Sequence, residues 1–238
     1  MIAGVVLAAG HSSRLGRPKQ LLPVLGEPLL RRTLRRVLAS SLDRVLVVVG
    51  HEADAIRDAV ADLPVDVILN PDAALGQSTS VHAGLAALTP ETEAALFILG
   101  DQPGIDPKVI DALSAAWRSS RAPVVAPRYE NGMGNPILFD QRVFPELATL
   151  AGDTGARPVV RAYRATGELR LVPVAGPAPP DVDTEADYAA LIAALSQQSE
   201  RHPRRLTAQP VAEKGKDDCV PCESKNSPSP CAQGEGLG

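Results

Sequence analysis

Short apolar runs recur along this chain, and they constrain its fold more than any other feature. Residues 5–7, 45–49, 65–69 and 96–99 consist mostly of Val, Ile and Leu, without the polar alternation of a strand that has one solvated face. Such runs are typical of strands that are buried on both faces of a parallel sheet. The sequence therefore predicts a sheet of parallel strands.

Helical patterns occupy the segments between these runs. In residues 29–38 the apolar positions follow a 3.6-residue period and define one helix face, opposite four arginines; these positions are Leu29, Leu30, Leu34, Val37 and Leu38. Residues 53–61, 80–88 and 107–117 are expected to form further helices. The alternating order predicts a doubly wound α/β sheet, in which ligands bind beyond the carboxyl ends of the strands.

The second half of the chain is less regular. We expect two strands, near residues 124–126 and 136–139, then two helices and a final helix at 184–195. From residue 196 onward Gln, Ser, Pro, Lys and Gly dominate, which predicts one domain over 1–195 and a disordered tail over 196–238. Cys219, Cys222 and Cys231 lie in this tail, where incidental thiols are favoured over a four-ligand zinc site.

Charge and hydropathy exclude several classes of function. The net charge of −4 and the pI near 5.6 argue against a broad nucleic-acid-binding surface, which needs clustered basic residues. No apolar run approaches the roughly 20 residues of a membrane span. The opening apolar stretch, residues 2–9, lacks the basic flank of a signal peptide. We therefore expect a cytosolic protein without nucleic-acid or membrane partners.

A loop rich in small and basic residues follows the first predicted strand. Small residues allow close approach of the backbone to a ligand, and arginine and lysine supply charge for phosphate groups. The segment lacks the Gly-Lys-Ser/Thr ending of a Walker loop and the Gly-x-Gly-x-x-Gly dinucleotide fingerprint. The candidate phosphate-binding residues are Leu7, Ala8, Ala9, Gly10, Ser12, Ser13, Arg14 and Lys19.

This loop carries a resemblance to a known family. Residues 7–23 read Leu-Ala-Ala-Gly-x-Ser-x-Arg-x-Gly-x-Pro-Lys-x-Leu-Leu-Pro, which resembles the signature of the MobA-like nucleotidyltransferases and, within them, of the molybdenum cofactor cytidylyltransferases. The resemblance extends in pieces over residues 2–195. It implies a Rossmann-like three-layer α/β/α fold with a mostly parallel sheet, NTP binding by the loop and release of pyrophosphate. Ala8-Ala9-Gly10 and Leu21-Leu22-Pro23 favour CTP within this family.

Two acidic motifs are candidates for a magnesium site. Asp101 directly follows a predicted buried strand, in the motif Gly-Asp-Gln-Pro where the resembling family has its metal aspartate. Mg²⁺ prefers one or two carboxylates together with phosphate oxygens and water. The resemblance assigns the second carboxylate to Asp183, in the segment Asp-Val-Asp-Thr. The alternative for both motifs is a role in turns or helix caps, with Asp183 or Thr184 capping the final helix.

Further polar segments are candidates for recognition of the base and of the acceptor. On the nucleotide side these are Asn70, Gly76, Ser78 and Ser80; the alternative is a loop followed by a helix cap at Ser78 or Thr79. On the acceptor side the resemblance points to Gly134, Asn135 and Arg157. Asn135 replaces a histidine found in some members, which favours hydrogen bonding over acid–base catalysis. Arg157 has a surface ion pair as its alternative.

The expected function combines these motifs. The resemblance implies transfer of CMP from CTP, or of another nucleotide, to a molybdopterin-type acceptor, with Mg²⁺ as cofactor and Arg14, Lys19 and Asp101 as catalytic residues. A molybdenum hydroxylase or its accessory chaperone is the expected protein partner. The alternatives are a guanylyl- or sugar-phosphate nucleotidyltransferase, a non-catalytic protein that delivers molybdenum cofactor, and an α/β redox protein.

Overall fold

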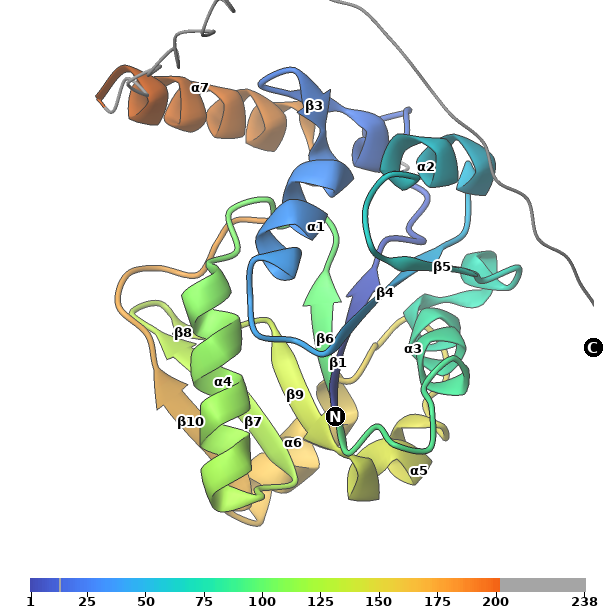
Figure 1. The fold of residues 1–238 in the computed structure, drawn as a ribbon, viewed down its shortest axis with the longest axis vertical. Helices are drawn as coiled ribbons and strands as arrows, with labels where there is room; N and C mark the ends of the chain where they lie inside the picture. The colour runs from blue at the N-terminus through green and yellow to red at the C-terminus, as the bar shows by residue number, and fades with distance from the viewer. Residues whose placement is uncertain (13, 202–238) are drawn as a thin grey trace, which may run out of the picture. The chain divides into compact units, whose positions relative to one another are not determined.

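The computed structural model describes residues 1–12 and 14–201, and within them a single mixed sheet forms the centre of the fold (Figure 1). The strand order is β10-β7-β9-β6-β1-β4-β5, with β8 paired to β7. The strands are β1 (Ile2–Leu7), β4 (Arg44–Val49), β5 (Asp66–Leu69), β6 (Ala94–Leu99), β7 (Val124–Tyr129), β8 (Gly132–Met133), β9 (Ile137–Asp140) and β10 (Leu169–Pro173). Ser13 and the three cysteines of the predicted tail lie outside the described residues.

Most of this sheet is parallel, as predicted. Strand β1 pairs in parallel with both β4 and β6, and β4 with β5, while β9 runs antiparallel between β6 and β7. The parallel centre has the apolar sequences expected of strands covered on both faces. The carboxyl ends of β1, β4 and β6 consequently meet at one edge of the sheet.

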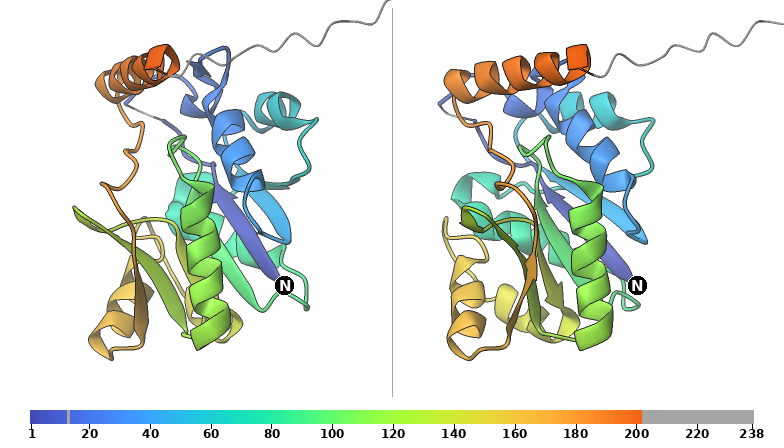
Figure 2. Two further views of the ribbon diagram at one scale, coloured as in Figure 1. Left: turned by 60° about the vertical axis from the view of Figure 1, so that its left-hand side comes forward. Right: turned by 90° about the vertical axis from the view of Figure 1, so that its left-hand side faces the viewer.

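Helices cover both faces of the sheet (Figure 2). Neighbouring residues of β1 point to opposite sides, since Val6 packs with α1, α2 and α4 and Val5 with α3, α5 and α6. The helices are α1 (Leu29–Leu38), α2 (Ala53–Val60), α3 (Gln77–Ala86), α4 (Pro107–Ser120), α5 (Phe144–Leu147), α6 (Arg157–Ala165) and α7 (Glu185–Arg201). This arrangement confirms the α/β fold class.

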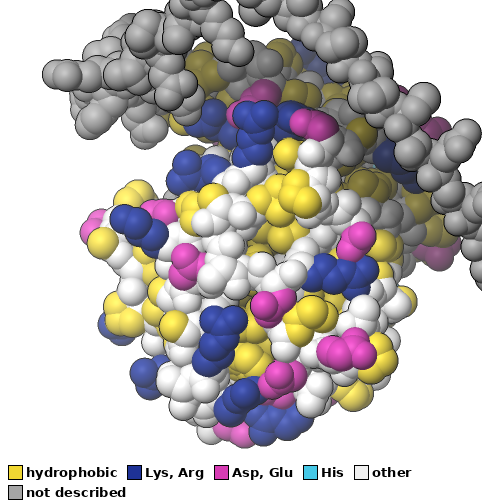
Figure 3. All heavy atoms as spheres, in the orientation of Figure 1, with side chains coloured by type: hydrophobic (Ala, Val, Ile, Leu, Met, Phe, Trp, Pro, Cys, Tyr) yellow, Lys and Arg dark blue, Asp and Glu magenta, His cyan; other side chains and the backbone are white. Residues whose placement is uncertain are grey.

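The remaining elements are short. They are the 3-10 turns η1 (Lys19–Leu21), η2 (Ala73–Leu75) and η3 (Gln141–Val143), and the hairpin strands β2 (Pro23–Val24) and β3 (Glu27–Pro28). Within the described residues, no helix is long and apolar enough to cross a membrane. Basic and acidic side chains are interspersed over the face in Figure 3.

Several helices extend beyond their predicted bounds. Helix α3 begins at Gln77 rather than at residue 80, and α4 continues to Ser120 rather than ending at 117. Helix α7 continues to Arg201, past the boundary predicted at residue 195. Its last turns contain Gln and Glu, which favour a helix even where apolar periodicity is lost.

A separate apolar cluster places α7 beside the loop that follows β1. Tyr188, Leu191, Ile192 and Leu195 of α7 pack against a buried group from the other end of the chain. That group consists of Leu15, Leu22, Val24 and Leu29 together with Val182. The packing brings the segment just before α7 to the edge of the sheet, where β1 and β6 end.

Candidate functional site

A cleft of about 700 Å³ opens at the carboxyl edge of the sheet. Three segments of the first half of the chain contribute to it: the loop after β1, the turn after β6 and the region from η2 into α3. Residues from the second half complete it. The lining includes Ala8, Ala9, Gly10, Lys19, Gln20, Gly76, Gln77, Ser80, Asp101, Asp153, Arg157, Asp181 and Asp183. Doubly wound α/β sheets bind their ligands at this edge.

The loop after β1 is fixed by side chains of its own sequence. Gln20 is buried, and its Nε2 donates hydrogen bonds to the carbonyl oxygens of Ala8 at 2.8 Å and Gly10 at 3.0 Å. Ser12 has a φ of 52°, a left-handed conformation that is uncommon for a residue other than glycine. The Ser12 Oγ accepts a hydrogen bond from the Lys19 backbone N at 3.1 Å. The hydrogen bonds of Gln20 and Ser12 therefore hold the two ends of this loop.

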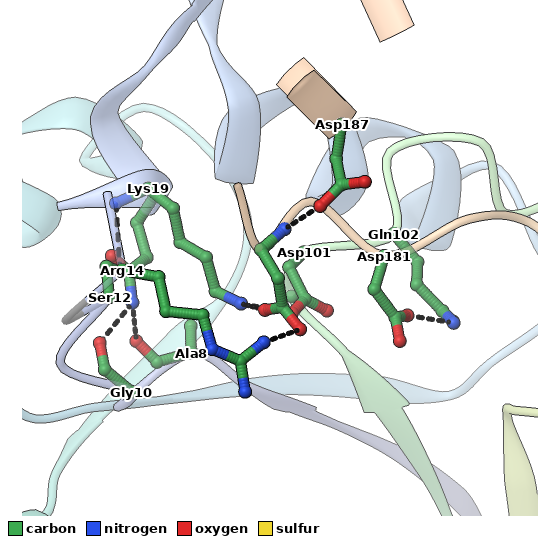
Figure 4. A network of polar contacts seen from close by, with 12 residues as sticks. Ala8, Gly10, Ser12, Arg14, Lys19, Asp101, Gln102, Asp181 and Asp187 are labelled. Atoms are coloured by element: carbon green, nitrogen blue, oxygen red, sulfur yellow. Dashed lines mark hydrogen bonds and ion pairs between the residues drawn. The ribbon is translucent and has the colours of Figure 1, made fainter. Parts of the chain in front are cut away.

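Lys19 lies between two carboxylates from distant parts of the chain. Its Nζ donates a hydrogen bond to Asp101 Oδ2 and a second, of 2.8 Å, to Asp183 Oδ1. Figure 4 shows the Lys19 side chain pointing toward Asp101. Burial alone would lower the pKa of the Lys19 ammonium, but the charges and hydrogen bonds of Asp101 and Asp183 raise it above its ordinary value. Lys19 is therefore a fixed positive charge in the cleft.

The carboxylate of Asp183 is available to the cleft because its neighbours cap α7. Thr184 Oγ1 accepts a hydrogen bond from the Asp187 backbone N at 3.2 Å, and Asp187 Oδ2 accepts one from the Thr184 backbone N at 2.8 Å. This reciprocal pair has the form of a capping box. Thr184 thus performs the capping role that the sequence left open between Asp183 and Thr184. Arg14 also reaches Asp183, with 3.6 Å between Arg14 Nη1 and Asp183 Oδ2.

A third carboxylate, Asp181, lies in the same cleft. Gln102 Nε2 donates a hydrogen bond of 2.7 Å to Asp181 Oδ1. Burial, together with the negative charge of Asp101, raises the pKa of Asp181. Three carboxylates, those of Asp101, Asp181 and Asp183, therefore lie at this edge together with the positive charges of Lys19 and Arg14.

The carboxylates of Asp101 and Asp183 suit a divalent ion whose other ligands come from a nucleotide and water. Asp101 Oδ1 is buried and has no hydrogen-bond partner, so this carboxylate has a free coordination position. In the described part of the chain, no group of three or more His, Cys, Asp and Glu side chains is arranged to hold a metal ion. Asp101 and Asp183 alone would leave most positions for phosphate oxygens and water, as Mg²⁺ prefers.

The predicted base-recognition residues separate into two groups. Gly76 and Ser80 line the cleft, whereas Asn70 and Ser78 lie behind its wall with 3% and 2% of their surface exposed. The Asn70 Nδ2 donates hydrogen bonds to Thr79 Oγ1 at 2.9 Å and to Ser80 Oγ at 3.0 Å, so its amide organises the wall. Direct contact of Asn70 or Ser78 with a ligand stays a prediction.

The start of α3 also differs from the predicted cap. Gly76 precedes the helix with a φ of 121°, and no side chain of its own caps it. Asp153, from the loop before α6, instead accepts a hydrogen bond from the Gln77 backbone N at 3.2 Å. A Cβ at Gly76 would lie 2.6 Å from the backbone carbonyl group of Gly152, so this contact requires glycine.

The predicted acceptor residues are likewise divided. Arg157, at the start of α6, lines the large cleft and also a smaller pocket of about 90 Å³ beside it, which Asn135 and Phe139 line as well. Gly134 lines neither, because its Cα faces the Tyr129 ring, where a Cβ would lie 3.1 Å from Cε2. Contact of Gly134 with the acceptor stays a prediction.

A family model describes this architecture. The MobA-like NTP transferase domain matches residues 4–167, which is more than half of the chain. The chain belongs to this family. The match ends before Asp181 and Asp183, so these two carboxylates lie in the part of the cleft that the family model does not cover.

Relatives in this family differ in their reported activities. Nicotine blue oxidoreductase from Paenarthrobacter nicotinovorans is 34% identical and aligns over 67% of this chain and 81% of its own length. Purine catabolism protein PucB from Bacillus subtilis is 30% identical, over 82% of this chain and 98% of its own. A probable molybdenum cofactor guanylyltransferase from Thermococcus kodakarensis is 29% identical, over 56% of this chain and 63% of its own.

A solved structure shares the same architecture. Rv0371c from Mycobacterium tuberculosis H37Rv, in complex with manganese, superposes with a TM-score of 0.71 at 34% identity. The alignment covers 81% of this chain and 98% of that chain.

Sequence patterns missed three residues of this MobA-like site. Gln20 and Gln102 each adjoin a recognised charged residue, and this adjacency was the available signal. Asp153 lies in a segment, residues 152–157, that resembles a family element, but its capping role gave no local signal because its partner is the Gln77 backbone, 76 residues earlier in the chain.

Proposed function

We propose that this chain transfers the nucleoside monophosphate of an NTP, CTP foremost, to a phosphorylated acceptor of the molybdopterin class and releases pyrophosphate. The observation that supports this most is the meeting of Lys19, Asp101 and Asp183 in one cleft beside the loop after β1. A triphosphate requires positive charge and backbone amides at one end and a metal-binding carboxylate at the other. The loop residues 8–10, Lys19, Asp101 and Asp183 line the same cleft, which supports this proposal.

The proposed reaction is a direct displacement at the α-phosphorus. An oxygen of the acceptor phosphate forms the new bond to this phosphorus, and the bond between the α-phosphorus and the bridging oxygen to the β-phosphorus breaks. The bonding electrons leave with pyrophosphate. The acceptor phosphate is already anionic, so no side chain has to act as a nucleophile, and catalysis consists of positioning and charge neutralisation.

The residues of the loop have distinct roles in this proposal. The backbone of Ala8, Ala9 and Gly10, held by Gln20, approaches the phosphates closely. Arg14 and Lys19 bind the β- and γ-phosphates and stabilise the charge that develops on pyrophosphate. Arg14 is suited to this because its side chain is 73% exposed and its guanidinium lies 3.6 Å from Asp183, a residue that lines the cleft.

A divalent ion, Mg²⁺ in the cell, is proposed to bind between Asp101 and Asp183. It would neutralise the phosphate charge that repels an anionic acceptor. The free oxygen of Asp101 supports this assignment, and so does the manganese found with the related Rv0371c.

The acceptor is proposed to lie toward α6. Arg157 lines both the cleft and the smaller apolar pocket, so a phosphate on Arg157 would place the adjoining ring system near Asn135 and Phe139. Molybdopterin combines such a phosphate with a ring system. The name of the Thermococcus kodakarensis relative supports a molybdenum cofactor, but with guanylyl transfer, so GTP is the nucleotide to compare with CTP.

Reduction of a ring compound is the second candidate. The Paenarthrobacter nicotinovorans relative is an oxidoreductase, and the same cleft could accept the pyrophosphate of a nicotinamide dinucleotide. The three acidic residues around Lys19 favour a metal-bound triphosphate over that ligand.

One experiment separates these candidates. The protein is incubated with Mg²⁺, molybdopterin and each of CTP, GTP, ATP and UTP in turn, and pyrophosphate is measured. A parallel reaction contains NADPH and a quinonoid dye, with absorbance at 340 nm recorded. Pyrophosphate release with one NTP, dependent on acceptor and metal, is the expected result. NADPH oxidation without pyrophosphate from any NTP would overturn the proposal in favour of the second candidate.

A further inference from the structure

We propose that the Lys19 ammonium occupies the position of the divalent ion in the nucleotide-free protein, and that metal and nucleotide replace it together. Metal and nucleotide then bind with positive coupling, and the origin of this coupling is the displacement of Lys19. This inference rests on the proposed metal and nucleotide sites.

The contacts of Lys19 are those expected of a substitute cation. Its Nζ bonds one oxygen of Asp101 and one of Asp183, the two carboxylates assigned to the metal. Only 15% of the Lys19 side chain and 16% of the Asp101 side chain are exposed, so water screens this charge pair poorly. A metal ion cannot take these two oxygens while the ammonium remains between them.

Charge balance predicts that neither ligand displaces Lys19 efficiently alone. A metal ion without nucleotide would push a positive side chain out of contact with its carboxylates and give it no new partner. A triphosphate without metal would attract Lys19 but would leave Asp101 and Asp183 facing each other and the phosphates, with Asp181 nearby. When both bind, the metal neutralises the carboxylates and the phosphates receive the ammonium.

The surrounding structure confines the exchange to the Lys19 side chain. The Lys19 backbone N is held by Ser12 Oγ. Asp183 keeps its place without Lys19, because its backbone N donates a hydrogen bond to Asp187 Oδ2 at 3.2 Å and the Val182 N donates one to the Asp101 carbonyl oxygen at 3.2 Å. A lysine side chain has a flexible four-carbon stem and can move its ammonium group from a carboxylate to a phosphate without movement of the backbone.

The test is the affinity for Mn²⁺ in the absence of nucleotide. The probe is Mn²⁺ alone, and the concentration of free ion is measured by electron paramagnetic resonance in the wild type and in Lys19→Met, which keeps an unbranched side chain but removes the ammonium group. We expect Lys19→Met to bind Mn²⁺ about tenfold more tightly than the wild type. Equal or weaker binding by the variant, or no binding to either protein, would overturn the inference.

A matched control and a second readout isolate the role of Lys19. Arg17→Met removes a nearby positive charge that pairs with Glu185, with 2.7 Å between Arg17 Nη2 and Glu185 Oε1. Glu185 is not one of the two carboxylates assigned to the metal. Arg17→Met should leave the Mn²⁺ affinity unchanged. An increase in Mn²⁺ affinity equal to that of Lys19→Met would show that the loss of any nearby positive charge has this effect, and would contradict the inference. Calorimetric titration of CTP with and without Mn²⁺ should show strong enhancement by the metal in the wild type and a smaller one in Lys19→Met.

The outcomes also separate this inference from the proposed activity. If pyrophosphate forms but Lys19→Met fails to bind Mn²⁺ more tightly, only the displacement of Lys19 is wrong. If the variant binds Mn²⁺ more tightly but no NTP yields pyrophosphate, the exchange stands and the proposed reaction fails. Circular dichroism melting of each variant confirms that the compared proteins are folded.

Discussion

Thr184 and Asp187 bond to each other at the start of α7, and this pair leaves Asp183 free to reach Lys19. The Asp187 carboxylate accepts hydrogen bonds from the backbone N atoms of both Asp183 and Thr184. An acidic residue in the first turn also interacts favourably with the helix dipole. The capping of α7 and the completion of the cleft are therefore achieved by different residues of one short segment.

Replacement of Asp101 should abolish nucleotidyl transfer. Asp101→Asn removes one negative charge from the metal site but keeps the shape of the side chain, so kcat should fall at least ~100-fold while the protein stays folded. Pyrophosphate release at saturating NTP measures the loss. Turnover close to that of the wild type would refute the assignment of Asp101 to the metal.

Replacement of Arg157 should affect the acceptor more than the nucleotide. Arg157→Ala removes a charge-assisted hydrogen bond to the acceptor phosphate and should raise the acceptor KM about tenfold, with little change in the KM for NTP. Arg161 is exposed one turn further along α6 and lines neither pocket, so Arg161→Ala is the matched control. Equal effects of the two substitutions would contradict the acceptor role.

A methyl group at Gly84 should destabilise the packing of α3 on the sheet. Its Cβ would lie 2.5 Å from Val5 Cγ1, and Val5 is fully buried. Overpacking costs about 1–3 kcal/mol, and the higher helix propensity of alanine offsets about 1 kcal/mol of this. We expect Gly84→Ala to melt roughly 2–4 °C below the wild type.

The control for Gly84 is another glycine with free space around it. A Cβ at Gly10 meets no atom within 4 Å, so Gly10→Ala should melt at or slightly above the wild-type temperature. The single tryptophan, Trp117, is buried and reports unfolding by fluorescence in both variants. A Gly84→Ala protein as stable as Gly10→Ala would show that the sheet yields at Val5.

Asp62 should titrate at unusually low pH. The hydrogen bonds from the Arg31 guanidinium lower the pKa of Asp62 from 3.8 to about 2. Because the folded-state value is the lower one, this pair stabilises the protein above the ordinary aspartate pKa and loses its contribution as pH falls toward 2. Carboxyl chemical shifts in NMR measure the pKa, and Arg31→Gln should return it toward 3.8. An unchanged value in that variant would exclude Arg31 as the cause.

A chain that ends at Arg201 should retain activity and stability. Among residues 1–12 and 14–201, those that line the cleft lie between Leu7 and Asp183, and the apolar contacts of α7 extend to Leu195. Removal of 202–238 should therefore leave kcat, both KM values and the melting temperature unchanged. A loss of metal-dependent turnover in the shortened chain would assign a role to the terminal segment and its cysteines.

The local sequence was sufficient to predict the order of the main strands and helices. Buried strands and amphipathic helices have distinct patterns of apolar residues. The apolar run 45–49 and the apolar face of α1, which lies opposite its arginines, can therefore be recognised within a few residues. The position of the loop after β1 and of Asp101 at the cleft was predictable for the same reason. Each directly follows such a strand, and parallel strands end at the edge where ligands bind.

Tertiary structure alone decided how these segments combine. Three features join residues that are far apart in sequence: the antiparallel insertion of β9, the Asp153 cap on α3 and the bond between Lys19 and Asp183. Lys19 and Asp183 are separated by 164 positions. Local periodicity contains no information about such pairs. The Lys19–Asp183 pair depends on the packing of α7 against Leu15, Leu22 and Val24, which brings the end of the domain back to the loop at its beginning.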